Sequence, residues 1–233
     1  MKPKFAFKIS VDFAMTVLLL LLMARQLTGD SAHEWLGAGM FLLWIAHHAL
    51  NFRWYGRLFR GKYTPLRAAQ AAVNLLLFLS MLGTMASAVI LSREIFAFLP
   101  ISGGIALART MHVLCAFWSF VLMSMHLGLH WNGILGMLRR SVGPARSGSQ
   151  RAALWAAGSL IAAYGLYAFV KNQIPSYLFL QSSFVYFDFE RPMPLFFAEY
   201  AAMMGFFVFA AHAGSKWARR RAAGKKAENP HAT

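Results

Sequence analysis

Six long apolar runs constrain the fold of this chain more than any other feature of its sequence. Each is close to the roughly 20 residues that a helix needs to cross the hydrocarbon core of a bilayer. Hydrophobic residues make up 58% of the chain and charged residues 13%, which argues against an ordinary soluble domain. The sequence therefore predicts an all-α membrane protein with six transmembrane helices. The runs lie at about residues 5–24, 35–51, 68–92, 105–130, 152–170 and 195–215.

The segments between the apolar runs are short, which predicts a single transmembrane helical domain over residues 1–215. Within it we expect a core four-helix bundle at about residues 5–131, packed against additional helices at about 152–170 and 195–215. A basic cytoplasmic tail over residues 216–233 follows the last run. The sequence has no repeat of roughly 20–50 residues, so a repeat architecture is not expected.

Basic residues gather on one side of the predicted helices. The net charge is +15, and 18 of the 23 Lys and Arg residues precede the first run or follow the second, fourth and sixth. Six of the eight acidic residues lie on the other side. By the positive-inside rule, both termini then lie in the cytoplasm. Basic segments placed in this way fit contacts with membrane lipid headgroups, and they argue against a nucleic-acid partner.

Histidines recur at one spacing in two of the apolar runs. His33 and His47 are 14 residues apart, and so are His112 and His126. After 14 residues a helix has turned back to within about 40° of its starting face and has advanced about 21 Å along its axis. Both helices run from outside to inside, so His33 and His112 share an outer level and His47 and His126 an inner one. A haem iron takes two axial ligands from opposite faces, so the pattern predicts two haem b groups stacked across the membrane.

Two further histidines leave alternatives open at the inner level. His48 points about 100° away from His47, and either could be the ligand there. His130 lies one turn inward of His126, where it could bond a haem propionate or a quinone, anchor the helix end, or itself be the ligand. We expect no catalytic residue in the chain.

Single histidines in membrane helices also have other uses. They bond neighbouring helices, or they line proton and metal routes. Gly37 lies one turn from His33, where the missing side chain would let a flat ring approach the backbone. Close packing of two helices is the alternative explanation for Gly37.

At these residues the chain resembles a known family. The segments HEWLG, AHHALNFRW, MHVLCAFW and MHLGLHW resemble the flavinylation-associated cytochrome b family over roughly residues 10–135. That family is similar in layout to the cytochrome b subunits of formate dehydrogenase. The resemblance implies a four-helix haem bundle that passes electrons across a bacterial membrane, often to an extracytosolic flavoprotein. His33, His47, His112 and His126 match the family's ligand positions, and Asn51 stands where some relatives have another histidine.

An aromatic segment at about residues 172–194 lies outside the resemblance and is the longest expected outer loop. It could form a docking surface or a lid over the outer haem. An aromatic belt at the membrane–water interface is the alternative.

We therefore expect a di-haem b-type cytochrome in the bacterial inner membrane, with both termini cytoplasmic. It would pass electrons from a quinol or another cytoplasmic-side donor to an extracytoplasmic flavoprotein or other redox partner. The chain has no nucleotide-binding glycine motif and no C-x-x-C-H motif, so neither nicotinamide binding nor covalent haem is expected. A membrane quinone or ferric reductase-like oxidoreductase is one alternative. A metal-ion or proton transporter that uses intramembrane histidines is the alternative from another class.

Overall fold

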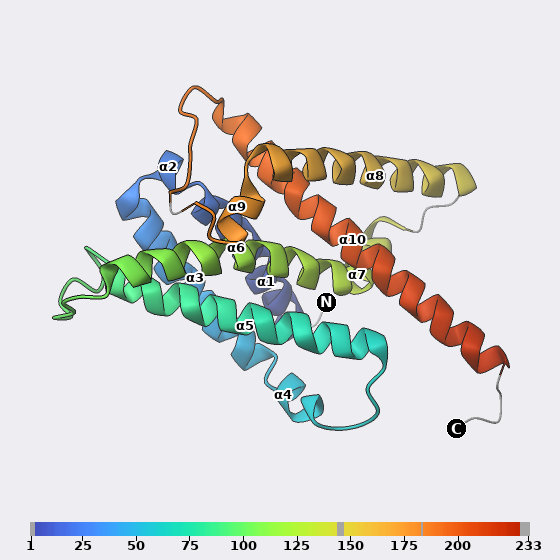
Figure 1. The fold of residues 1–233 in the computed structure, drawn as a ribbon. Coiled ribbons are helices and arrows are strands. Elements are labelled where there is room, and N and C mark those ends of the chain that lie inside the picture. The colour runs from blue at the N-terminus through green and yellow to red at the C-terminus, as the bar shows by residue number, and fades with distance from the viewer. Residues whose placement is uncertain (1–2, 144–146, 183, 229–233) are drawn as a thin grey trace. The chain divides into compact units, whose positions relative to one another are not determined.

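The computed structural model describes residues 3–143, 147–182 and 184–228, and over these residues the chain is helical with no β-strand (Figure 1). This confirms the predicted all-α class. The end of the expected basic tail, residues 229–233, lies outside the described residues. The helices are α1 (Pro3–Met23), α2 (Arg25–Thr28), α3 (Asp30–Leu50), α4 (Arg53–Leu58), α5 (Pro65–Leu91), α6 (Ile105–Leu129), α7 (Trp131–Val142), α8 (Gly148–Lys171), α9 (Ile174–Leu178) and α10 (Met193–Glu228).

Among the described residues, five helices are long and apolar enough to cross a membrane: α1, α5, α6, α8 and α10. By their length and composition the chain is a multi-pass membrane protein. The remaining expected span, 35–51, corresponds to α3, which is a continuous helix of 21 residues but is not one of these five. Polar residues explain the difference, because α3 carries Glu34, His33, His47 and His48 among its apolar residues.

Local sequence signals set several helix ends. Ser147 accepts a hydrogen bond from the backbone N–H of Gln150, whose side chain accepts one from the Ser147 backbone, so a capping box starts α8. Pro65 opens α5, where its missing N–H costs no hydrogen bond, and Thr64 accepts from the backbone N–H of Arg67. Gly29, at φ 84°, separates α2 from α3 in a conformation that favours glycine.

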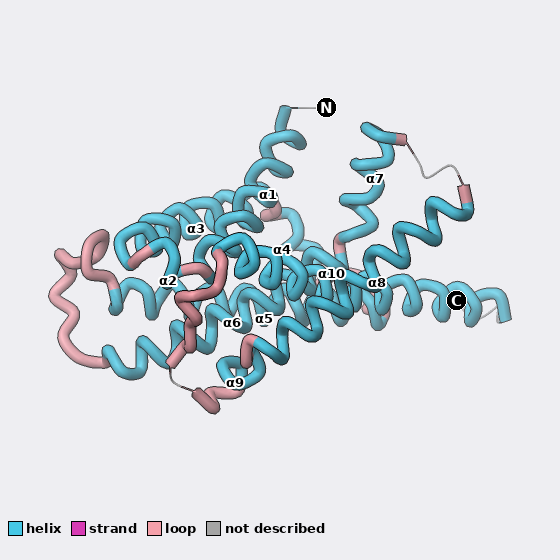
Figure 2. Tube along the Cα trace, turned by 90° about the horizontal axis from the view of Figure 1, so that it is seen from above, coloured by secondary structure: helices cyan, strands magenta, loops and turns pink. Residues whose placement is uncertain are grey.

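The chain divides into two compact units. The first comprises residues 1–62, 78–119 and 176–197, and the second comprises 63–77, 120–175 and 198–233. The single domain stays a prediction. Loop residues of the first unit at 92–104, 179–182 and 184–192 are drawn in pink in Figure 2.

The first unit contains α1 and α3, the C-terminal part of α5, the N-terminal part of α6, and α9. Val11, Met15 and Leu19 recur every four residues on α1 and are buried. The indole N–H of Trp118 on α6 donates to the carbonyl of Leu178 at 3.0 Å, which ties α6 to α9. Buried apolar side chains and this hydrogen bond therefore both contribute to the packing of the unit.

The second unit packs α8 and α10 through small residues. A Cβ on Gly165 of α8 would collide with the backbone carbonyl of Ala202 on α10, so the two backbones approach very closely. Glu199 on α10 is 1% exposed, and its carboxylate accepts hydrogen bonds from Lys171 at 2.8 Å and Asn172 at 2.6 Å. This buried acid is therefore bonded at both oxygens.

Candidate functional site

The structure places the two histidines of the predicted outer level side by side in the first unit. His33 lies in the first turn of α3 and His112 lies near the start of α6. Their ring centroids are 6.1 Å apart, and the ring planes are inclined by 71°. Two imidazoles from segments far apart in the sequence therefore lie next to each other.

Hydrogen bonds to α5 fix the proton on the His112 ring. Its Nδ1 lies 3.2 Å from the Thr84 carbonyl oxygen and 3.2 Å from the Ser87 hydroxyl oxygen. A carbonyl oxygen can only accept, so Nδ1 must carry the proton. A neutral imidazole with its proton on Nδ1 has its lone pair on Nε2, where a metal can bind.

His33 has a buried nitrogen without a partner. Its Nδ1 is shielded from solvent and makes no hydrogen bond. An unsatisfied buried polar atom costs about 1–3 kcal/mol, so such atoms call for an explanation. His212 of α10 also has a buried Nδ1 without a partner, but its ring stacks on Trp155 and not on a second imidazole. The His33 nitrogen is thus an unsatisfied atom beside a second potential ligand.

The spacing of the outer pair suits two axial ligands of one iron. Bonds of about 2 Å from a metal to each imidazole nitrogen would put the ring centroids roughly 6 Å apart. An edge-to-face aromatic pair has a similar separation. The unpartnered nitrogen of His33 and the proton position on His112 are the features that favour ligation over simple ring packing.

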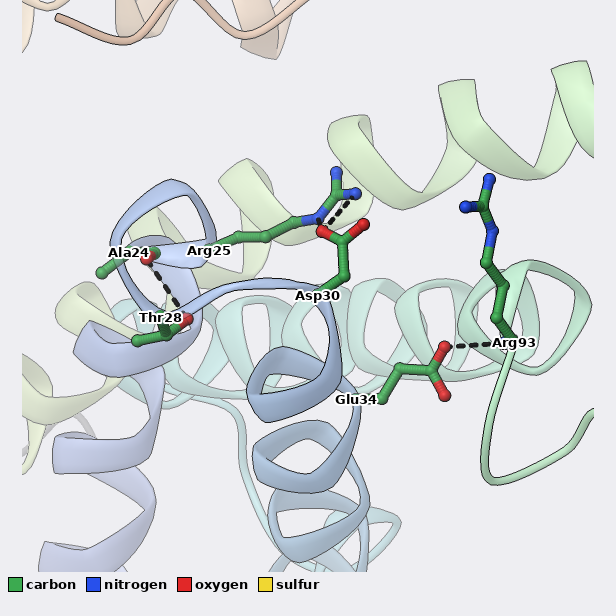
Figure 3. Close-up of polar contacts among 6 residues, drawn as sticks. All are labelled: Ala24, Arg25, Thr28, Asp30, Glu34 and Arg93. Carbon is green, nitrogen blue, oxygen red and sulfur yellow. Dashed lines mark hydrogen bonds and ion pairs between the residues drawn. The ribbon is translucent and has the colours of Figure 1, made fainter. Parts of the chain in front are cut away.

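Glu34 fastens the start of α3 to the turn that follows α5. Its carboxylate accepts hydrogen bonds from the Ser92 hydroxyl at 2.9 Å and from the backbone N–H groups of Arg93, Glu94 and Ile95 at 2.6, 3.1 and 3.2 Å. Figure 3 shows the bond to Arg93. Because Glu34 follows His33 directly, this carboxylate also fixes the N-terminal end of the helix that carries His33.

An ion pair holds the connection from α2 to α3. The Arg25 guanidinium lies 2.8 Å from the Asp30 carboxylate (Figure 3). Both side chains are more than half exposed, so the pair contributes about 0–1 kcal/mol to stability.

The histidines of the predicted inner level are each bonded within their own unit. In the first unit, Nδ1 of His47 lies 2.7 Å from the Asp12 carboxylate of α1. In the second unit, Nδ1 of His126 lies 2.7 Å from the amide oxygen of Asn74 on α5. Both acceptors place the ring proton on Nδ1, as at His112. His47 and His126 belong to different units, so their pairing stays a prediction.

His48 has a different environment from His47. Its Nδ1 lies 2.6 Å from the Tyr55 hydroxyl of α4, and its ring contacts Trp44 and Phe78 edge-to-face, at 4.4 and 5.2 Å between centroids. Partial burial raises the pKa of the Tyr55 phenol, which therefore stays protonated and can donate to His48. This contact holds His48 in an aromatic cluster and favours His47 as the ligand.

Two other predicted site residues lie where the sequence suggests. The His130 ring is 4.7 Å from that of His126, at the end of α6. No heavy atom lies within 4 Å of the position that a Cβ on Gly37 would occupy. Among the described residues Gly37 therefore does not serve close helix packing.

The residues that bond the histidines were not predicted as site residues. They include Asp12, Tyr55, Asn74, Thr84 and Ser87. Asp12 and Asn74 gave a sequence signal, because each is a polar side chain inside an apolar run. Thr84 contributes a backbone carbonyl, which side-chain identity does not reveal.

Over the described residues, no group of three or more His, Cys, Asp or Glu side chains could hold a metal ion. A haem iron needs two axial protein ligands, so the haem prediction does not depend on such a group. No protein-family model, curated protein or solved structure matches this chain.

Proposed function

We propose that this chain is a di-haem b-type cytochrome that passes electrons across a bacterial inner membrane. His33 and His112 would hold a haem near the outer surface, and His47 and His126 would hold a second one near the inner surface. When bound, haem supplies a one-electron couple at its iron, which the axial imidazoles and their hydrogen bonds tune. The donor would be a quinol or another cytoplasmic-side reductant, and the acceptor an extracytoplasmic flavoprotein or other redox partner.

The observation that carries this proposal is the outer histidine pair. The equal histidine spacing and the predicted direction of the two helices together predict that His33 and His112 share a level, and in the first unit their ring centroids lie 6.1 Å apart. The Thr84 carbonyl holds the proton of His112 on Nδ1, which leaves the lone pair on Nε2. Nδ1 of His33 is buried and has no hydrogen-bond partner, which supports the proposal that a haem binds at this place.

In this proposal α3 is the sixth membrane span. A helix of 21 residues is long enough, because a rise of about 1.5 Å per residue gives about 31 Å, close to the roughly 30 Å of a bilayer core. Polar residues in a membrane helix usually face the interior of the bundle, where they serve a function. Histidine ligands on α3 would explain why this span is less apolar than the other five.

The test is the visible spectrum of the purified full-length chain. Reduction with dithionite should produce the sharp bands of low-spin b haem, and extraction should yield two non-covalent haems per chain. A colourless chain that remains folded would contradict the proposal. If the purified chain instead contained zinc or another metal ion and no haem, the transporter alternative would be favoured.

A further inference from the structure

Asp12 places a carboxylate inside the apolar sequence of α1. The Asp12 side chain is 45% exposed, and its Oδ1 lies 2.7 Å from Nδ1 of His47. A carboxylate in a membrane helix is costly unless it has a partner, so this contact has a strong reason to persist. Both residues lie in the first unit, and the contact stands without reference to the second.

The carboxylate changes what His47 can do as a ligand. An acceptor on Nδ1–H fixes the ring orientation and makes Nε2 a stronger electron donor to a metal. The negative charge also favours the oxidised, more positive state of an iron on the far side of the ring. Both effects lower the reduction potential of a haem that His47 ligates.

The oxygen atoms that face Nδ1 of the predicted outer ligand His112 are neutral. His112 bonds the Thr84 carbonyl and the Ser87 hydroxyl, and His126 bonds the Asn74 amide oxygen. Nδ1 of His33 makes no hydrogen bond. The outer pair therefore lacks the ionised acceptor that His47 has, and the two levels differ in ligand basicity.

We propose that Asp12 is a positioning residue that lowers the reduction potential of the haem at His47 below that of the haem at His33 and His112. This inference rests on the proposed function and adds a direction to it. Haems held at the His47 level and at the outer level would supply two one-electron couples, and a lower potential at His47 would favour electron transfer outward, with no proton or bond transferred. The difference in potential makes this outward step favourable.

The experiment is a redox titration of the purified full-length chain and its variants, followed in the visible bands. His33→Ala removes the outer ligand, and the haem that remains should have the lower of the two wild-type midpoint potentials. Asp12→Asn keeps a hydrogen-bonding side chain of the same size but removes the charge. It should keep two haems and shift the lower midpoint upward, with the higher one unchanged.

Ser87→Ala serves as the control. It acts on the partner of His112, so it should leave the lower midpoint at its wild-type value. If Asp12→Asn does not retain its haem, Asp12→Glu keeps the charge and should preserve a low midpoint.

The results separate this inference from the proposed function. A chain without haem would contradict the proposed function itself. Two bound haems with an unchanged or lowered midpoint in Asp12→Asn would overturn the role of Asp12 alone. An Asp12→Glu chain with both midpoints at the higher wild-type value would also overturn it.

Discussion

The chemistry of single imidazoles decides what the candidate site can bind. At His47, His112 and His126 an oxygen atom accepts from Nδ1, which leaves the lone pair of the neutral ring on Nε2. A histidine that only bonded a neighbouring helix would need no such uniform orientation. The repeated use of Nδ1 is what three metal-ligating histidines would share.

Gly37 provides a prediction at the residue scale. A Cβ at this position meets no heavy atom within 4 Å, and alanine in a helix interior is about 0.5–1 kcal/mol more stable than glycine. Gly37→Ala should therefore fold and bind haem normally. Gly37→Leu should fill the space one turn from His33 and reduce the haem content from two towards about one per chain. Two retained haems in folded Gly37→Leu would show that no flat ring lies against this glycine.

Packing between whole helices sets the position of His112. Gly83 of α5 faces Cys115 of α6, and a Cβ on Gly83 would lie 2.6 Å from the Cys115 Sγ atom. His112 is three residues before Cys115, almost one helical turn, and bonds the carbonyl of Thr84 directly after Gly83. The close approach of α5 and α6 at this point therefore brings the Thr84 carbonyl within hydrogen-bond distance of His112.

Enlarging Gly83 tests this packing at the element scale. Gly83→Ala should lower the stability by about 1–3 kcal/mol, because the added methyl group overlaps the sulfur atom. Adding Cys115→Ala should remove the overlap and restore most of the loss. Thermal unfolding in detergent, together with haem content, measures both effects. If the double variant is no more stable than Gly83→Ala, the contact with Cys115 does not limit this position.

Sequence patterns predict the helices better than they predict the contacts between them. The apolar runs locate all the long helices, and α10 continues beyond the expected end at residue 215 because Ala, Lys and Arg favour helix formation. Spacing along one helix predicts that His33 and His47 share a face. It does not reveal that Asp12 of α1 meets His47, because that contact depends on how two helices pack.

The membrane topology of the whole molecule depends on whether α3 crosses the membrane. If it does, the chain has six spans and the basic segments share the cytoplasmic side. Reporters fused after Arg67 and Arg151 should then read cytoplasmic, and a reporter near Ser102 should read extracytoplasmic. A reporter after Arg67 on the outer side would contradict this topology: either α3 does not span, or all six spans are inverted and the order of the two haem levels is reversed.

The measurement that tests the central claim most directly is haem per chain in single-histidine variants. We predict two haems in the wild type and about one in His33→Ala and in His112→Ala, because each variant loses an axial ligand of the same outer haem. The double variant should also keep one. His212→Ala is the matched control, since His212 is a membrane-helix histidine that stacks on Trp155, and it should keep two. Loss of both haems in the double variant, or two haems in either outer single variant, would contradict the account.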